Sequence, residues 1–161
     1  TSDGVWADFS PKPLADKPGN GMHINMSVES RDGQDHSAAF MAGILEHIRE
    51  MTLFLNPIRE SYERLGDMKA PKFVSWSEQN RSQLIRIPAS RSDLKRFELR
   101  SPDPMANPYL AFALLIYAGL DGVDARELYE QAGLLHARLL DPEWLAVQIQ
   151  GMELQHDAVP F

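Results

Sequence analysis

Hydrophobic and polar positions alternate along residues 21–28, GMHINMSV, and this period of two predicts a β-strand with one side in the core. The other side carries His23, Asn25 and Ser27 in line, which are an imidazole, an amide and a hydroxyl. Residues 18–21 precede the strand as a glycine-containing turn whose backbone is able to approach a small ligand closely. The strand therefore has one face in the core and a candidate binding face on the other side.

A second strand with the same period is predicted at residues 95–100, where Arg96, Glu98 and Arg100 share one face. A carboxylate between two arginines on one face has two interpretations. It is either a cross-strand charge ladder or part of a site in which a metal ion and guanidinium groups hold an anion. This segment alone favours the ladder, and the other segments shift the balance toward the anion site.

Two short strands are predicted at residues 73–76 and 83–87. Arg86 lies in the second of them and Arg81 lies just before it. Their spacing puts them on opposite faces of a straight strand. A bend after Ser82 is therefore needed to aim both toward one side. The arginines, Glu98 and His23 of these segments together indicate a site for a polyanion and a divalent cation.

Helical spacing of apolar positions predicts helices at residues 35–55 and 61–65, and a third from Asn107-Pro108 to about residue 120 that Gly122 closes. The third helix is apolar on nearly all sides, which is typical of burial on several sides. We therefore expect its aromatic residues in the core: Tyr109, Phe112 and Tyr117. An amphipathic helix at residues 124–140 and a short helix through residue 150 are expected to follow.

The chain has 161 residues, 43% of them hydrophobic, which is enough for one domain with its own core. Its net charge of −7 and the lack of a basic stripe argue against a nucleic-acid partner. The lack of cysteine excludes disulfides and thiolate metal sites and fits a cytoplasmic protein. The longest apolar run, residues 110–117, is too short to span a membrane, and residues 1–10 lack the features of a signal peptide. Because the chain starts without Met in what looks like the middle of a domain, we interpret it as a fragment.

Four segments resemble, in this order, the C-terminal catalytic domain of glutamine synthetase: KPLADKPGNGMHINMS (12–27), NPIRESYERL (56–65), APKFVSWSEQNRSQLIRIP (70–88) and KRFELRSPDPMANPYLAFALLIYAGLDGV (95–123). The resemblance implies an α+β fold of the glutamine synthetase/guanido kinase-like kind, with a curved antiparallel sheet backed by helices and the site on its concave face. Residues 1–123 would form the C-terminal part of the catalytic domain. Residues 124–161 would form a helical extension packed on the same domain.

The resemblance also implies ATP-dependent ligation of ammonia to glutamate. ATP phosphorylates the side-chain carboxylate, and ammonia then displaces phosphate from the γ-glutamyl phosphate. By similarity, His23 and Glu98 bind the metal, Mg²⁺ or Mn²⁺, that bridges the ATP phosphates. Arg81 and Arg86 match ATP-phosphate contacts, and Arg81 is expected to stabilise the transferring phosphoryl group. Two further residues match family positions that lie near the nucleotide: Asn25 and Ser27.

Arg64 and Arg100 match positions that hold the glutamate carboxylates, and Gly19 stands where a backbone group touches the amino acid. The loop GDMKAP, residues 66–71, departs from the family. It places Lys69 where the family has a glutamate that closes over the substrate and helps to deprotonate ammonium, and a cation there repels ammonium. Asp67 is the candidate replacement for that glutamate.

Three functions stay open at this point. The leading one is glutamate–ammonia ligation by the full-length protein, which by resemblance is a homo-oligomer whose sites are completed by the N-terminal domain of a neighbouring subunit. Lys69 keeps open the ligation of glutamate to another amine or a polyamine. The third is a non-catalytic member that binds ligands or partner subunits, which the retention of His23 and Glu98 speaks against. The fragment alone is expected to be inactive, since the family's other metal-binding glutamates lie upstream.

Overall fold

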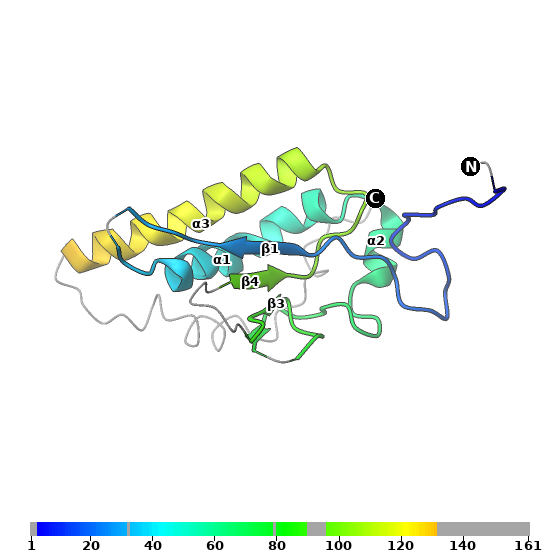
Figure 1. The fold of residues 1–161 in the computed structure, drawn as a ribbon, viewed down its shortest axis with the longest axis horizontal. Coiled ribbons are helices and arrows are strands. Elements are labelled where there is room, and N and C mark those ends of the chain that lie inside the picture. The colour runs from blue at the N-terminus through cyan, green and yellow to red at the C-terminus, as the bar shows by residue number, and fades with distance from the viewer. Residues whose placement is uncertain (1–2, 32, 79, 90–95, 132–161) are drawn as a thin grey trace.

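The computed structural model describes residues 3–31, 33–78, 80–89 and 96–131 (Figure 1). The elements of this part of the chain follow in the order β1 (Ile24–Ser27), α1 (Ser37–Leu55), α2 (Arg59–Arg64), β2 (Trp76–Ser77), β3 (Ile85–Arg86), β4 (Arg96–Leu99) and α3 (Pro108–Gln131). Each overlaps a predicted element. Helices α1 and α3 lie side by side, and the strands lie along them.

The four strands form one sheet in the order β1-β4-β3-β2. Strand β4 pairs antiparallel with both β1 and β3, whereas β2 pairs parallel with β3. The α+β class is confirmed, but the prediction of a wholly antiparallel sheet is wrong for the β2–β3 pair. The reason is that alternation tells which side chains face the core and carries no information on strand direction.

The core lies between the sheet and α1. Apolar side chains of the strands, among them Ile24, Ile85 and Leu99, form one buried cluster with Ile44 and Ile48 of α1. Burying each such side chain stabilises the fold by about 1.5–3 kcal/mol. The polar positions of β1 are exposed, so the alternation predicted for this strand is confirmed.

Helices α1 and α3 approach closely because glycines stand where they cross. A Cβ on Gly122 would lie 2.7 Å from the Gly43 nitrogen and would collide with the carbonyl oxygen of Ala39. Gly122 therefore permits helix contact. The prediction that it ends the helix is wrong, since α3 continues to Gln131.

Helix α3 begins where the sequence predicts. Asn107 Oδ1 accepts hydrogen bonds from the backbone N–H groups of Tyr109 (3.0 Å) and Leu110 (3.3 Å), which caps the first turn. The amphipathic helix predicted at residues 124–140 is continuous with α3 as far as Gln131. Its remainder, like the rest of the predicted extension, lies outside the described residues.

Apart from Leu115, helix α3 buries mostly small side chains, and it exposes several large ones. The predicted core positions are exposed: Tyr109 (84%), Phe112 (47%) and Tyr117 (76%). That prediction is wrong because a helix that is apolar all round carries no signal of which side packs. Within the described residues, Pro108–Arg126 is long and apolar enough to cross a membrane by length and composition, although the uninterrupted apolar run inside it is shorter.

Candidate active site

A row of polar side chains crosses the sheet on the face away from the core. In the strand register, Glu98 of β4 stands opposite Asn25 of β1 on one side and Arg86 of β3 on the other. Directly opposed residues of neighbouring strands point to the same face. His23 and Arg100 lie two positions from Asn25 and Glu98, so they extend this row.

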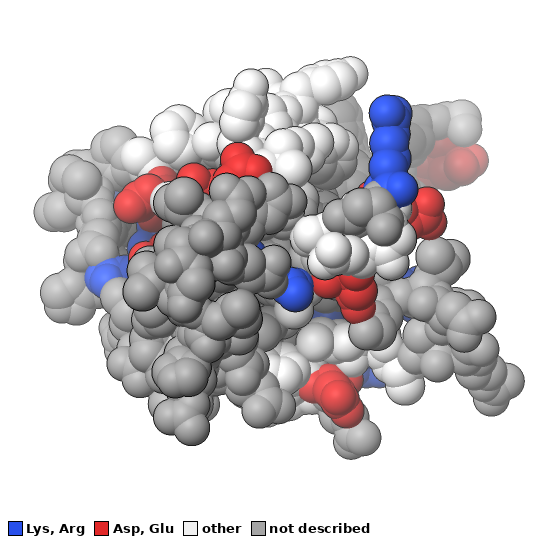
Figure 2. All heavy atoms as spheres, turned by 90° about the vertical axis from the view of Figure 1, so that its left-hand side faces the viewer, with Lys and Arg blue, Asp and Glu red and all other residues white. Residues whose placement is uncertain are grey.

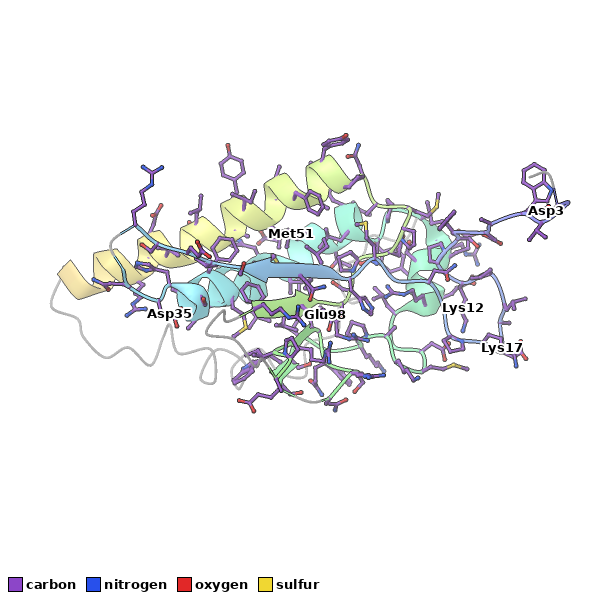
Figure 3. All side chains as sticks on the ribbon, in the orientation of Figure 1. Asp3, Lys12, Lys17, Asp35, Met51 and Glu98 are labelled. Carbon is purple, nitrogen blue, oxygen red and sulfur yellow. The ribbon has the colours of Figure 1, made fainter. Side chains whose placement is uncertain are left out.

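Glu98 is the centre of the row, and the four residues Glu98, His23, Arg86 and Arg100 are called the Glu98 centre below. Glu98 Oε1 lies 2.9 Å from His23 Nδ1 and accepts a hydrogen bond from Arg100 Nη1 at 3.2 Å. Glu98 Oε2 accepts a hydrogen bond from Arg86 Nε at 2.6 Å. Glu98 is buried, and Figure 3 labels it near the middle of the sheet. The same-face arrangement predicted for His23 and Glu98 is therefore present.

The surroundings keep Glu98 ionised and favour a neutral His23. Burial by itself raises the pKa of Glu98, but the hydrogen bond from Arg86 and the charge of Arg100 outweigh it, so the pKa is lowered. Burial and the charge of Arg100 lower the pKa of His23 against the opposing effect of Glu98. A neutral imidazole is the form that binds metal ions.

His23 and Glu98 fit one part of a metal site. An imidazole beside an ionised carboxylate suits a hard divalent cation whose remaining ligands are oxygen atoms. Among the residues that the structure describes, no group of three or more His, Asp or Glu side chains could hold a metal ion. The pair therefore suits Mg²⁺ or Mn²⁺ only together with ligands from elsewhere.

Arg81 lies on an exposed turn that Asn80 shapes. Asn80 Oδ1 accepts hydrogen bonds from the backbone N–H (2.9 Å) and the hydroxyl (2.8 Å) of Ser82. This turn lies at residues 80–82, before the position at which the bend is predicted, and the common orientation of Arg81 and Arg86 stays a prediction. The backbone carbonyl of Arg81 also accepts a hydrogen bond from Arg100 Nε at 2.8 Å, so Arg100 ties the turn to the Glu98 centre.

Asn25 and Ser27, predicted to lie near the nucleotide, are exposed on the polar side of β1. Ser27 stands opposite Arg96 in the register of β1 and β4. Both share the face of Glu98 because they alternate with the core-facing side chains of β1. A ligand that approaches this face meets an amide and a hydroxyl beside the Glu98 centre.

Arg64 of α2 is buried and contacts the backbone that follows β4. Its guanidinium donates to the carbonyl oxygens of Ser101 (Nη1, 2.7 Å) and Arg100 (Nη2, 3.0 Å). A Cβ on Gly19 would lie 2.9 Å from Arg64 Cγ, and one on Gly21 would lie 2.5 Å from Arg64 Nη2. Gly21 therefore makes room for Arg64, and Gly19 makes room for Arg64 and for the carbonyl oxygen of Pro11, which would lie nearer still. Sequence reasoning does not assign this role to them.

Asp67 is held by a lysine. Its carboxylate pairs with Lys12 Nζ, and Lys12, whose side chain is 6% exposed, also donates to the carbonyl oxygen of Lys17 at 2.6 Å. Lys69 is exposed. The candidate replacement for the ammonium-site carboxylate is thus already neutralised by a cation. Sequence reasoning misses Lys12 because no local spacing relates it to the distant loop of Asp67.

A buried polar group holds the segment after β4 in place. Asn56 Nδ2 donates to the carbonyl oxygen of Ser101 at 2.8 Å and to Asp103 Oδ2 at 3.1 Å. Asp103 Oδ1 accepts a hydrogen bond from the backbone N–H of Met105 at 2.9 Å. Sequence reasoning also misses these residues, although polar residues beside prolines in NP and SPDP signal turns.

Residues 1–133 match the family model of the glutamine synthetase catalytic domain. The chain is 47% identical over 134 residues to the glutamine synthetase of Methanosarcina mazei, a match that covers 74% of this chain and 30% of that protein. It is 43% identical over 130 residues to the glutamine synthetase of Pyrococcus abyssi, with the same coverage of both chains.

Solved structures agree with these relatives. The cryo-EM structure of Plasmodium falciparum glutamine synthetase matches with a TM-score of 0.66 at 32% identity, over 73% of this chain and 26% of that chain. A complex of GmaS with ADP matches with a TM-score of 0.68 at 27% identity, over 91% of this chain and 42% of that chain. The chain spans about 30% of the length of the curated relatives that it matches.

Proposed function

Because the chain belongs to the glutamine synthetase family, we propose that the full-length protein joins ammonia to glutamate in an ATP-dependent reaction through a γ-glutamyl phosphate. The Glu98 centre carries the proposal, since His23 Nδ1 lies 2.9 Å and Arg86 Nε 2.6 Å from the carboxylate. A buried carboxylate with a neutral imidazole suits a hard cation, and the guanidiniums beside it suit phosphate oxygens.

The arginines have different tasks in this proposal. Arg86, held by Glu98, offers a fixed charge to the phosphates of ATP, and the exposed Arg81 reaches the phosphoryl group that is transferred. Fixed positive charge lowers the barrier because negative charge develops on that group in the transition state. Two positions on the same face contact the nucleotide: Asn25 and Ser27.

His23 and Glu98 would hold Mg²⁺ or Mn²⁺. The cation, when bound, neutralises phosphate oxygens and polarises the transferring phosphoryl group. His23 contributes as a neutral ligand because burial and the charge of Arg100 lower its pKa. Glu98 contributes as a carboxylate because the guanidiniums keep it ionised.

Glutamate is bound at the other end of the row. We assign its carboxylates to Arg100 and to Arg64, and the close backbone approach to Gly19. Arg64 already donates to the carbonyl oxygens of Arg100 and Ser101, so in this scheme it uses its remaining N–H groups on the substrate and also positions Arg100.

The described residues supply part of a site, so the proposal includes a homo-oligomer in which a neighbouring subunit completes it. The 161-residue chain alone is expected to have no ligase activity, because the phosphoryl group would lack metal ligands and would face solvent. We place the full-length protein in the cytoplasm, where ATP, glutamate and ammonia are available.

One observation favours a different amine acceptor. Asp67 is the one acidic residue of the loop at residues 66–70, and it is paired with Lys12, while Lys69 is exposed. A loop with this charge attracts ammonium weakly. The second candidate function is therefore the ligation of glutamate to another amine or a polyamine with the same ATP and glutamate groups.

Phosphate release by the full-length protein with ATP and glutamate, measured with ammonium and with a panel of amines, distinguishes these functions. Highest turnover with ammonium supports the leading proposal, and higher turnover with another amine supports the second candidate. Absence of turnover with ammonium and with every amine tested would mean a non-catalytic member.

The variant Lys69→Glu tests the loop directly. It should lower the KM for ammonium if Lys69 faces the acceptor, because a carboxylate attracts the cation. The matched control Lys72→Glu makes the same charge change at a lysine that lies over the Phe73 ring, 5.3 Å from its centroid. An equal effect of both variants would mean that only the overall charge of the region matters.

A further inference from the structure

A lysine from the segment before β1 is buried against the loop that follows α2. Lys12 Nζ donates one hydrogen bond to Asp67 Oδ2 and another to the carbonyl oxygen of Lys17, at 2.6 Å. The side chain of Lys12 is 6% exposed, whereas charged side chains at the other end of the molecule reach its surface in Figure 2. A buried ammonium group is costly unless it is paired and hydrogen-bonded. The two acceptors therefore hold Lys12 in one place, and Lys12 in turn holds Asp67.

The segment that carries Lys12 folds back on itself beside Arg64. The carbonyl oxygen of Pro11 accepts a hydrogen bond from the backbone N–H of Asn20 at 2.8 Å. A Cβ on Gly19 would collide with the same oxygen and would lie 2.9 Å from Arg64 Cγ. The segment is thus a closed loop that packs on Arg64, and Figure 3 labels Lys12 on it.

Asp67 lies in a short loop, residues 66–70, whose backbone shape needs support. The loop begins beside Arg64, whose carbonyl oxygen accepts a hydrogen bond from the backbone N–H of Asp67 at 3.1 Å. Met68 is exposed and has φ 48°, a left-handed conformation that residues other than glycine adopt rarely and that the surroundings must hold. The hydrogen bond from Lys12 supplies such support from outside the loop.

We propose that Lys12 is a positioning residue, which through Asp67 fixes the loop at residues 66–70 beside Arg64 before any substrate binds. Resting on the proposed function, this role places the fixed loop next to glutamate, because Arg64 is assigned to a glutamate carboxylate. A loop ordered during folding costs nothing to order when the substrate arrives. Asp67 serves Lys12 in this arrangement and does not act as a base.

A pair that only stabilised the fold would behave differently. Loss of general stability would affect both substrates and every part of the chain alike. Loss of positioning should weaken glutamate binding and spare ATP, because the phosphates of ATP are assigned to Arg81 and Arg86, away from the loop at residues 66–70.

The kinetics of the full-length protein give the first test. Lys12→Met should raise the KM for glutamate about tenfold and change the KM for ATP by no more than about twofold. Lys12→Arg keeps the charge and should stay closer to the parent. The control Lys17→Met makes the same charge change in the same segment, at a side chain that is 63% exposed and lies 3.6 Å from Asp16, and should change neither KM.

Trypsin cleavage gives the second test, which needs no ligase activity. Lys69 is exposed, and cleavage of the Lys69–Ala70 bond follows the population of open loop. Lys12→Met should speed this cleavage about tenfold and leave the Arg49–Glu50 bond within α1 unaffected. Asp67→Asn should have the same effect, and the double variant should be no faster than either single variant if the two residues act as a pair.

Unchanged cleavage of the Lys69–Ala70 bond in both single variants would overturn the proposal, and so would equal acceleration at both bonds, which would mean general loss of stability. Faster cleavage at Lys69 with an unchanged KM for glutamate would overturn the positioning role. If the parent ligates nothing, the proposed function fails by itself, and cleavage still decides whether Lys12 fixes the loop. If Lys12→Met does not fold, Asp67→Asn carries both tests, since the Asp67 side chain is 38% exposed.

Discussion

Gly43 of α1 and Gly122 of α3 meet backbone to backbone, so that a Cβ on Gly43 would lie 2.8 Å from the Gly122 nitrogen. The two residues fix the distance between the helices. Helix α3 is thereby held against α1, and α1 in turn covers the core side of the sheet.

Gly122→Ala should destabilise the protein by about 1–3 kcal/mol, because the helices must move apart to admit the methyl group. The sign is informative, since glycine to alanine within a helix ordinarily stabilises by about 1 kcal/mol. Urea unfolding of the full-length protein measures the change. The control Ala113→Gly, at an exposed position of α3, should lose only the helix propensity of about 1 kcal/mol. A Gly122→Ala variant as stable as the parent would contradict the close contact.

Glu98→Ala should raise the metal requirement of the full-length enzyme and lower its rate by about 10²–10³, with partial rescue by more Mg²⁺ or Mn²⁺. It should also cost about 3–5 kcal/mol of stability, because Arg86 and Arg100 lose their buried counter-charge. Activity against metal concentration, measured beside thermal unfolding, separates the two effects. Lost stability with an unchanged metal requirement in the folded fraction would support the charge-ladder interpretation.

Arg81→Ala should depress turnover by about 10²–10³ with little metal rescue, since its charge is needed most in the phosphoryl-transfer transition state. Its side chain is exposed, so stability should change by no more than about 0.5 kcal/mol. The same two measurements apply. Strong rescue by metal would contradict a role of Arg81 at the transferring phosphoryl group.

Arg64→Lys should destabilise the protein by about 2–4 kcal/mol, because one ammonium cannot reproduce the two-pronged contact with the carbonyl oxygens of Arg100 and Ser101. The exposed Arg59 of the same helix supplies the control Arg59→Lys, which should be neutral. The KM for glutamate in the folded fraction decides the second role of Arg64. An unchanged KM for glutamate would mean that Arg64 positions Arg100 and does not bind the substrate.

His47 of α1 should make stability depend on pH. The hydrogen bond with Asp121 raises the pKa of His47 above its ordinary value of 6.5, despite the opposing effect of burial. Stability gained from protonated His47 is therefore fully present below about pH 6.5, while Asp121 stays ionised, and is lost as the pH rises through the raised pKa. Asp121→Asn should remove this dependence at a cost of about 0.5–1 kcal/mol at low pH. Glu50→Gln is the control and should have a smaller effect, since the contact of Glu50 with His47 is longer at 3.4 Å. Melting temperatures that fall equally with rising pH in the parent and in Asp121→Asn would exclude a contribution of the His47–Asp121 pair to the pH dependence.

The sequence predicts the strand faces well because alternation is a local property. Residues 21–28 and 96–100 have their polar side chains on one face, as the alternation predicts. That His23 lies beside Glu98 depends on the pairing of β1 with β4, and only the family resemblance predicts it. Pairing direction is a different matter. Nothing in residues 73–87 distinguishes a parallel from an antiparallel partner, and there the prediction fails.

Contacts to backbone atoms and between distant loops escape the sequence. Arg64 looks like a substrate ligand by resemblance, yet its partners here are carbonyl oxygens, which every residue type carries. Lys12 and Asp67 meet only after the chain has folded. On α3, Tyr117 and Ala118 are equally apolar in pattern, and only packing against α1 decides that Ala118 is buried.

The sequence separations within the Glu98 centre predict an order of assembly. Arg86 and Glu98 are 12 positions apart and Arg100 follows Glu98 by 2, so pairing of β3 with β4 closes a short loop and neutralises the carboxylate with guanidiniums. Arg100 and His23 are 77 positions apart, and closing such a long loop is slower. We therefore expect His23 to arrive last, when β1 docks on the other edge of β4. During refolding, Arg86 and Arg100 are therefore expected to neutralise Glu98 before its imidazole partner is in place.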